Sequence, residues 1–126
     1  MITAVHTLVY AADPDAARPF FSDVLGFPTV DTGGGWLIFR TGPSELAAHP
    51  SSWQYEGQSG STDQRFDVSL MCDDLAQTVS ELTAKGAEFV GGFSDEGWGI
   101  ATRMTVPGAG EMTLYQPKYD PPATSD

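Results

Sequence analysis

The sequence contains the same order of structural signals twice, and this repeat limits the folds that the chain can adopt. Residues 67–90 read as a strand, a helix capped by Asp74, a glycine stop and a further strand. Residues 6–30 have the same order, with Asp13 as the capping residue. Sliding one copy onto the other by 61 residues pairs Asp13 with Asp74. Few residues are identical, so the pattern itself predicts two modules of similar structure.

The second helix has the clearer signals. Asp74 can cap its first turn, and Gln77 follows three residues later, as in a capping box. Apolar residues then repeat with helical spacing, and Gly86 follows as a stop that accepts the left-handed conformation cheaply. These signals predict a helix over residues 75–85.

The first helix contains an interruption. Pro14 fits the first helical position after the Asp13 cap, and Gly26 is the expected stop. Pro19 falls about six residues into the helix, where a proline removes a backbone donor at a cost of about 3 kcal/mol. We therefore expect either a kink at Pro19 or a helix that begins properly only at residues 18–19.

Alternating apolar residues and turn signals predict eight strands, which we place at residues 2–11, 27–32, 36–41, 45–49, 65–72, 87–91, 100–106 and 111–116. The fold class is therefore α+β, with two tandem βαβββ modules at about residues 1–50 and 64–117. Residues 51–63, rich in Gly, Ser and Gln, are predicted to be a linker, and residues 118–126 a frayed tail. Trp53 and Tyr55 in the linker either pin it to the body or bind a ligand.

Composition excludes several classes of partner. The formal net charge of −11 argues against nucleic acids and anionic membranes. No apolar run approaches the ~20 residues of a membrane span, and the first residues lack signal-peptide features. Cys72 is the single cysteine, and its strand parity predicts a buried structural thiol. Without a disulfide, we expect a cytoplasmic protein.

Three segments carry a resemblance to a known family: HTLVYAADPDAARPFFSDVLGF at residues 6–27, SLMCDDLAQTVSELTAKGAEFV at 69–90, and VPGAGEMTLYQP at 106–117. Together they resemble the vicinal oxygen chelate (VOC) superfamily, the glyoxalase/bleomycin resistance protein/dioxygenase family. The resemblance implies that each module curls its strands into half of a cup, with helices on the outside. It also implies a homodimer, because small members of the superfamily usually pair.

The resemblance implies a divalent-metal site at four inward positions, two in each module. On this sequence they fall on His6 and Asp67 in the first strands, near His49 in one last strand, and on Thr113 in the other. His6, His49 and Asp67 would form a two-His-one-carboxylate set suited to Fe(II), Mn(II), Zn(II) or Ni(II). Thr113 stands where related enzymes have a glutamate that is both ligand and base, so a true glyoxalase I is not expected. The alternative is that both histidines are polar residues hydrogen-bonded to Asp67 or to the backbone.

The strand pattern also predicts an apolar, aromatic pocket with a few polar groups, the usual composition of a small-molecule site. Its predicted lining residues are Leu8, Tyr10, Trp36, Ala47, Trp53, Ser69, Met71, Trp98, Thr113 and Tyr115. Two functions follow, and a third possibility is a vestigial pocket in a purely structural dimer. One is a metal-dependent lyase, isomerase or dioxygenase acting on a small molecule with adjacent oxygens. The other is a metal-free protein that, like bleomycin-resistance proteins, sequesters an aromatic or cationic compound.

Overall fold

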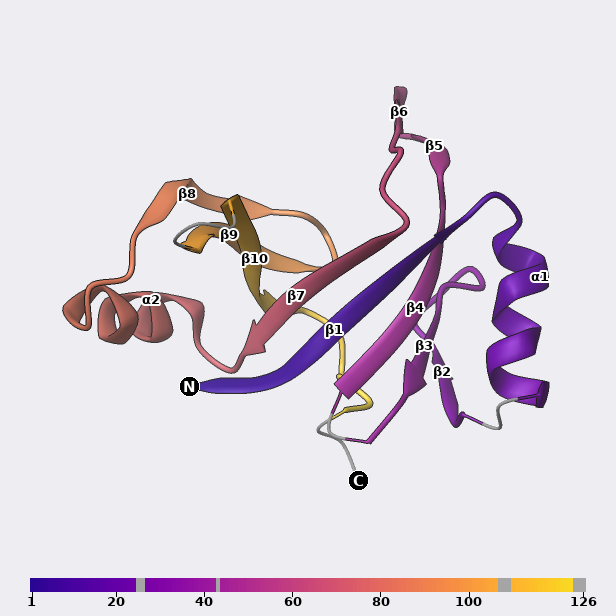
Figure 1. Ribbon diagram of the computed structural model, residues 1–126, viewed down its shortest axis with the longest axis horizontal. Helices are drawn as coiled ribbons and strands as arrows, with labels where there is room; N and C mark the ends of the chain where they lie inside the picture. Colours follow the sequence, from indigo (N-terminus) through magenta and orange to yellow (C-terminus); the bar gives the residue numbers. More distant parts are fainter. Residues whose placement is uncertain (25–26, 43, 107–109, 124–126) are drawn as a thin grey trace.

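The computed structural model describes residues 1–24, 27–42, 44–106 and 110–123 (Figure 1). In chain order its elements are β1 (Ile2–Ala11), α1 (Pro14–Pro19), the π-helical turn η1 (Phe20–Val24), β2 (Thr29–Asp31), β3 (Leu37–Arg40), β4 (Ser44–Pro50), β5 (Ser52–Tyr55), β6 (Gln58–Ser61), β7 (Phe66–Cys72), α2 (Leu75–Ala84), β8 (Phe89–Asp95), β9 (Gly99–Val106) and β10 (Gly110–Pro117). None of the described helices is long and apolar enough to cross a membrane.

The two modules join into one sheet of eight strands in the order β2-β3-β4-β1-β7-β10-β9-β8. Within each module the first strand pairs in parallel with the last, β1 with β4 and β7 with β10. The antiparallel pairing of β1 with β7 joins the halves. Read outward from this seam, the two halves have equivalent strand orders, so the predicted repeat and the α+β fold are confirmed.

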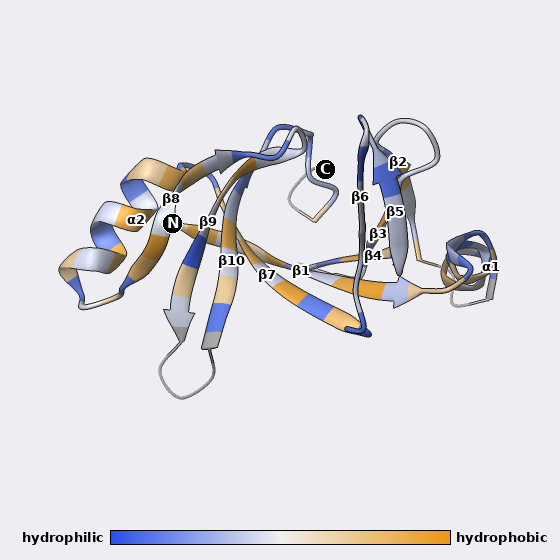
Figure 2. Cartoon of the chain, turned by 90° about the horizontal axis from the view of Figure 1, so that it is seen from above, coloured by the Kyte–Doolittle hydropathy of each residue, from blue (hydrophilic) through white to orange (hydrophobic). Residues whose placement is uncertain are grey.

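The sheet is bent around this seam. Figure 2 shows β1 and β7 as the floor, with the outer strands of the two modules turned up on either side. Helices α1 and α2 lie on the outer flanks, and the segment after β10 lies between the raised halves. We call the surface between them the concave face.

The first helix begins where the sequence predicted and changes its winding at Pro19. The Asp13 carboxylate accepts a hydrogen bond from the Ala16 N–H at 3.2 Å, as a capping residue does. The α-helix ends at Pro19 and a π-helical turn follows, so the expected late start is wrong. Proline has no backbone N–H to donate within the helix, and the wider π-helical turn accommodates this missing hydrogen bond. The predicted stop, Gly26, lies outside the described residues.

The second helix follows its predicted course. The Asp74 side chain accepts from the Gln77 N–H at 3.0 Å, and Lys85 closes the last turn before Gly86. Only half of the capping box forms, because the Gln77 side chain donates to Glu81 and does not return to residue 74. Cys72 is buried on the helix-covered face, packed with Leu75 and Leu114, as its strand parity predicted.

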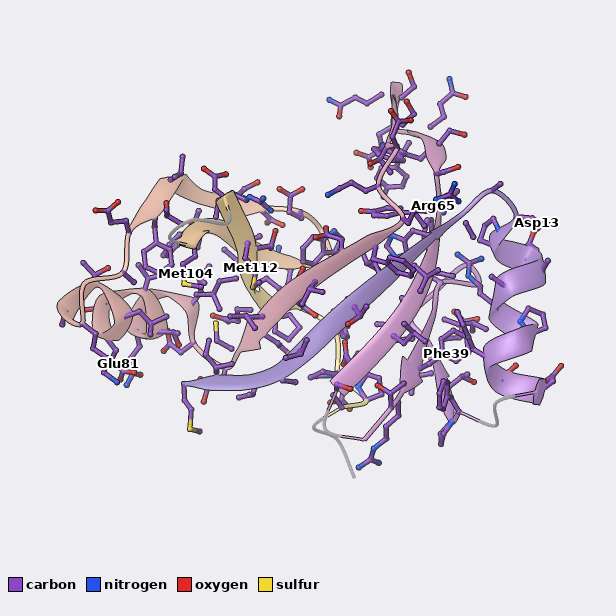
Figure 3. The ribbon with its side chains drawn as sticks, viewed as in Figure 1. Asp13, Phe39, Arg65, Glu81, Met104 and Met112 are labelled. Carbon is purple, nitrogen blue, oxygen red and sulfur yellow. The ribbon has the colours of Figure 1, made fainter. Side chains whose placement is uncertain are left out.

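A corresponding contact lies under the first helix. There the buried Phe39 ring (labelled in Figure 3) meets Phe21 edge-on. The two ring centroids are 5.3 Å apart. Each outer flank therefore has its own apolar contact between helix and sheet.

The predicted linker is wrong in one respect, because residues 52–61 form a hairpin of their own. Strands β5 and β6 pair through a two-residue turn, Glu56-Gly57, in which both residues have positive φ (49° and 76°). Two positive φ angles define the turn type whose twist suits a tight hairpin. Trp53 lies against Gly60, where an added Cβ would come within 2.6 Å of the indole. Tyr55 is exposed, so it does not pin this segment to the body.

Candidate functional site

The floor of the concave face is built from alternate residues of β1 and β7. His6 is opposite Ser69, and Leu8 is opposite Asp67. Directly opposed residues in an antiparallel pair share a face, so His6 and Asp67 lie on the same side but two positions apart. The predicted parity of these strands is therefore correct.

Glu45, and not His49, stands beside His6. The parallel register of β4 with β1 pairs His6 with Glu45 and Tyr10 with His49, which corrects the predicted last-strand position by four residues. His6 Nδ1 lies 2.6 Å from Glu45 Oε1, and a ring protonated at Nδ1 donates to this carboxylate. Both side chains are buried, and the Glu45 side chain is completely inaccessible. A buried carboxylate needs such donors, because a lost hydrogen bond to water must be replaced.

His49 occupies a second, more apolar environment on the same face. Its ring meets the Trp36 ring edge-on, with centroids 4.8 Å apart, and Arg18 lies 5.3 Å from the centroid of the same indole. Burial, and to a lesser extent the nearby His6 and Arg18, lower the pKa of His49 to about 4. At neutral pH this imidazole is therefore uncharged.

The three predicted metal ligands do not come together as a set. Within the part of the chain that the structure describes, no three His, Cys, Asp or Glu side chains are grouped so that they could hold a metal ion. His6 is hydrogen-bonded to Glu45, whereas His49 lies against Trp36. As they lie, His6, His49 and Asp67 do not fit the site that the resemblance implies, and metal binding stays a prediction.

The segment that was expected to fray instead crosses the concave face. We call residues Lys118–Ala123 the strap. The Tyr119 hydroxyl donates to Glu45 Oε1 at 2.9 Å, and the Ala123 N–H donates to Oε2 at 3.4 Å. Ala123 is part of a buried cluster with Met71 and Tyr115, against which Tyr119 packs. Residues 124–126 of the predicted tail lie outside the described residues.

Four hydrogen-bonding groups thus form one buried network around Glu45. The Tyr115 and Tyr119 hydroxyls are 2.6 Å apart, so Tyr115 can donate to Tyr119 while Tyr119 donates to the carboxylate. Burial raises the pKa of both tyrosines, and the neighbouring Glu45 adds to the rise. Both hydroxyls therefore remain protonated donors at neutral pH.

The internal repeat extends to two tryptophan pairs at the sides of this network. Trp98 meets Tyr115 edge-on with centroids 5.1 Å apart, as Trp36 meets His49. Each tryptophan directly precedes the third strand of its module, and each partner lies on the last strand. Both tryptophans remain nearly half exposed, at 44% and 47%.

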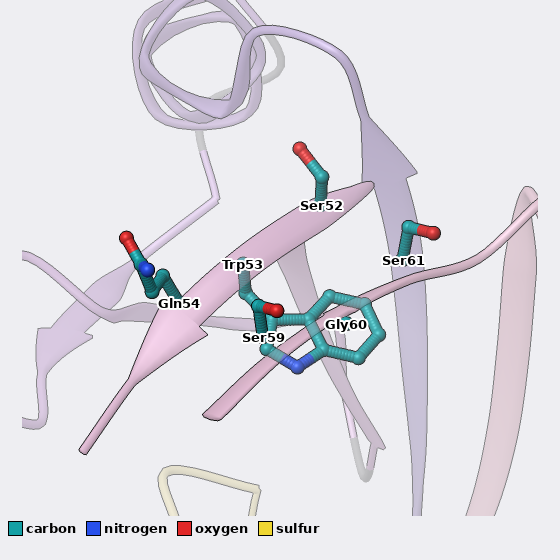
Figure 4. A pocket seen from close by; sticks show the side chains of 6 residues that line it. All are labelled: Ser52, Trp53, Gln54, Ser59, Gly60 and Ser61. Carbon is teal, nitrogen blue, oxygen red and sulfur yellow. The ribbon is translucent and has the colours of Figure 1, made fainter. Parts of the chain in front are cut away.

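All but one of the remaining predicted pocket residues lie on the concave face, either buried or partly exposed. Ala47, Ser69 and Met71 are buried on the concave face, while Leu8, Tyr10 and Thr113 are partly exposed there. Trp53 instead belongs to an open hollow of about 730 Å³ on the hairpin (Figure 4), lined by Ser52, Trp53, Gln54, Ser59, Gly60 and Ser61. A second hollow of about 260 Å³ lies beside α1, next to Arg18 and Leu37. Neither hollow contains His6, His49 or Asp67.

The sequence predictions missed two side chains of the network, those of Glu45 and Tyr119. Glu45 shares strand parity with its neighbours in the site, which is a usable signal, but the position implied by the family resemblance falls near His49. Tyr119 stands in a proline-rich stretch without periodicity, so nothing local indicated that it is packed.

A family model described as Glyoxalase/Bleomycin resistance protein/Dioxygenase superfamily matches residues 3–106. No curated protein matches.

Among solved structures, the chain is similar to a Legionella pneumophila protein described as NAD-dependent benzaldehyde dehydrogenase (TM-score 0.60, 11% identity, covering 90% of this chain and 99% of that one). It is also similar to methylmalonyl-CoA epimerase from Mycobacterium tuberculosis (TM-score 0.57, 14% identity, 94% and 88%). A third is a glyoxalase/bleomycin resistance protein/dioxygenase superfamily member from Vibrio splendidus (TM-score 0.50, 15% identity, 89% and 97%). At these identities the likeness shows the fold and not the chemistry. On the family model and this shared fold, the chain belongs to the glyoxalase/bleomycin resistance protein/dioxygenase superfamily.

Proposed function

We propose that the concave face binds a small aromatic molecule between the two tryptophan pairs without a metal. The observation that carries this proposal is the repeated pairing of Trp36 with His49 and of Trp98 with Tyr115. Two half-exposed indoles at equivalent positions of the two modules offer apolar contact from both sides of one ligand. Aromatic rings in such contacts contribute about 0.5–1.5 kcal/mol each beyond burial.

The polar groups on this face favour a ligand that donates hydrogen bonds or carries positive charge. Glu45 is an acceptor, and Asp67 lies on the same face near Tyr10. The net charge of −11 adds a general attraction for cations. His49 is uncharged at neutral pH, so it adds no positive charge next to Trp36.

The test is titration with proflavine, a flat aromatic cation, followed by calorimetry and tryptophan fluorescence. Replacing Trp36 or Trp98 with alanine should weaken binding about tenfold, because each change removes one ring contact. Trp53→Ala is the matched control, since Trp53 is exposed to a similar extent (43%) but packs on the hairpin. Equal losses in all three variants, or no binding to the unmodified chain, would contradict the proposal.

The metal-dependent alternative predicted from sequence needs a separate measurement. Elemental analysis of untagged protein, beside the His6→Ala variant, should find no stoichiometric transition metal. About one metal ion per chain that disappears in the variant would overturn metal-free binding. It would then favour a lyase, isomerase or dioxygenase that uses His6, His49 and Asp67.

Pairing of two chains is also part of the proposal. The convex side of β1 and β7, opposite His6, carries exposed apolar side chains, including Val5, Phe66 and Val68. A second copy is a suitable cover for such a surface. Analytical ultracentrifugation should find a dimer that Phe66→Asp weakens, and a monomer at all concentrations would contradict it.

A further inference from the structure

The strap places the Tyr119 side chain on the concave face, where it makes the kinds of contact that a bound ligand would make. The Tyr119 ring lies beside Tyr115, with centroids 6.5 Å apart, and its hydroxyl donates to Glu45. Tyr119 packs against the cluster that contains Met71 and Tyr115, while Ala123 is buried within it. An aromatic ring with one directed hydrogen bond is the arrangement expected of a small-molecule ligand in an apolar site.

The contacts of the strap come from both modules. Its first residue, Lys118, donates its backbone N–H to the Trp98 carbonyl at 2.9 Å, and Tyr119 and Ala123 then reach Glu45 on the other half of the sheet. Figure 2 shows the segment lying between the raised halves. The strap also lies beyond residues 3–106, the part of the chain that the family model matches.

The hydrogen bonds from the strap to Glu45 can be exchanged for bonds from another donor. Two of the donors to Glu45, the Tyr119 hydroxyl and the Ala123 N–H, come from the strap, whereas the His6 donor comes from the sheet. If the strap leaves, the carboxylate keeps His6 and can accept from another donor in place of Tyr119. A group that replaces the tyrosine must therefore bring a hydrogen-bond donor, or Glu45 would be left with part of its hydrogen bonding unmet.

From these contacts we infer that the strap is an internal competitor for the site, and that the ligand which displaces it is an aromatic compound with a hydroxyl or amino donor directed at Glu45. This inference rests on the proposed function, because it assigns the ligand chemistry and the regulation of that same face. In the closed state Tyr119 occupies the site, and binding requires the strap to leave.

The experiment compares two probes that differ only in the donor, 2-naphthol and 2-methoxynaphthalene, by calorimetry on the full chain. Tyr119→Phe keeps the ring but removes the hydroxyl that donates to Glu45, and hydrogen bonds to charged groups contribute enough to change an equilibrium about tenfold. The variant should therefore bind 2-naphthol about tenfold more tightly than the unmodified chain. The methyl ether should bind both proteins weakly. Tyr55→Phe, which changes an exposed tyrosine of the hairpin, should leave both affinities unchanged.

A second measurement follows the strap itself, first without a ligand and then with 2-naphthol. Hydrogen exchange of the Ala123 amide, which donates to Glu45, should be faster in Tyr119→Phe, and 2-naphthol should accelerate it in the unmodified chain. Unchanged 2-naphthol affinity in Tyr119→Phe, equal affinities for the two probes, or exchange that 2-naphthol slows would each overturn the inference.

The two proposals can fail separately. If proflavine binds with the expected dependence on Trp36 and Trp98 but the naphthol pair shows no dependence on Tyr119, only the strap inference fails. If neither proflavine nor 2-naphthol binds the unmodified chain or Tyr119→Phe, the proposed function fails, and the ligand chemistry assigned to Glu45 fails with it.

Discussion

The two modules have equivalent strand orders, but the acidic residues at equivalent positions lie in opposite environments, one buried and one exposed. Glu45 stands four residues before His49 on β4, and Glu111 stands four residues before Tyr115 on β10. The Glu45 side chain is buried within a hydrogen-bonding network, whereas Glu111 is exposed and lies 3.5 Å from the Arg103 guanidinium. The strap contributes to this difference, because Tyr119 and Ala123 donate hydrogen bonds to Glu45.

The helices of the two modules also differ, in length and in regularity. In the second module α2 runs for ten residues from a well-formed cap, whereas α1 has six residues before the π-helical turn begins. The comparison shows that the repeat specifies the sheet, while the local residues of each module specify its helix and its polar groups. Four predictions test this difference.

The largest expected effect is the loss of stability when the buried acid Glu45 is removed. Glu45→Ala should lower the free energy of unfolding by about 3 kcal/mol, because His6, Tyr119 and the Ala123 amide lose their acceptor. Glu111→Ala should change it by less than about 0.5 kcal/mol, as expected for an exposed pair. Urea denaturation of both variants measures the two values, and similar losses would show that the modules do not differ here.

The second prediction concerns pH and compares His49 with its counterpart Tyr115. The folded pKa of His49, about 4, lies below the ordinary value of 6.5, so the unfolded chain takes up the proton first as pH falls. The stability that neutral His49 contributes is complete above pH 6.5 and is lost as the pH falls toward 4, by roughly 2–3 kcal/mol. Tyr115, with its raised pKa, does not titrate in this range. His49→Gln should therefore lose less stability than the unmodified chain between pH 7 and 4, and parallel curves would contradict the prediction.

The third prediction compares the two helix caps. Asp74→Ala should cost about 1 kcal/mol, because the Gln77 N–H loses its acceptor at the start of a regular helix. Asp13→Ala should cost about half as much, since its 3.2 Å hydrogen bond begins a helix that changes winding after one and a half turns. Chemical denaturation with circular dichroism measures both, and a larger loss in Asp13→Ala would reverse the comparison.

The smallest effect is expected in the hairpin, which belongs to neither module. Gly60→Ala places a Cβ within 2.6–2.8 Å of the Trp53 ring, so the indole must move. The hairpin is an isolated pair of exposed strands, and global stability should change by less than about 0.5 kcal/mol. The emission spectrum of Trp53 should shift, and a large loss of stability would show that the hairpin supports the body.

Much of the fold could be predicted because its signals are local. The Asp13 and Asp74 caps, the apolar alternation of β1 and the glycine after α2 each act within a few residues. The hairpin could also have been found, since Glu56-Gly57 separates two four-residue runs, but polar strands lack the apolar alternation on which the prediction relied.

The site was less predictable because it depends on register and on distant contacts. A difference of four residues along β4 preserves the face, so parity alone could not distinguish Glu45 from His49 as the neighbour of His6. The contact of Tyr119 with Glu45 spans 74 residues, and no local pattern in the strap encodes it. What composition and parity could predict was an aromatic, polar concave face, and not which groups bond to one another.

The contact between Ala123 and Glu45 can form only late in the synthesis of the chain. The chain is made from its amino end, and Ala123 follows Glu45 by 78 residues. At the usual 5–20 residues per second, roughly 4–16 s pass between the two, during which the strap cannot yet supply its donors. The nascent first module must therefore keep the Glu45 carboxylate hydrated or hydrogen-bonded to His6 alone. The strap can therefore close the concave face only after the strands of both modules have been synthesised.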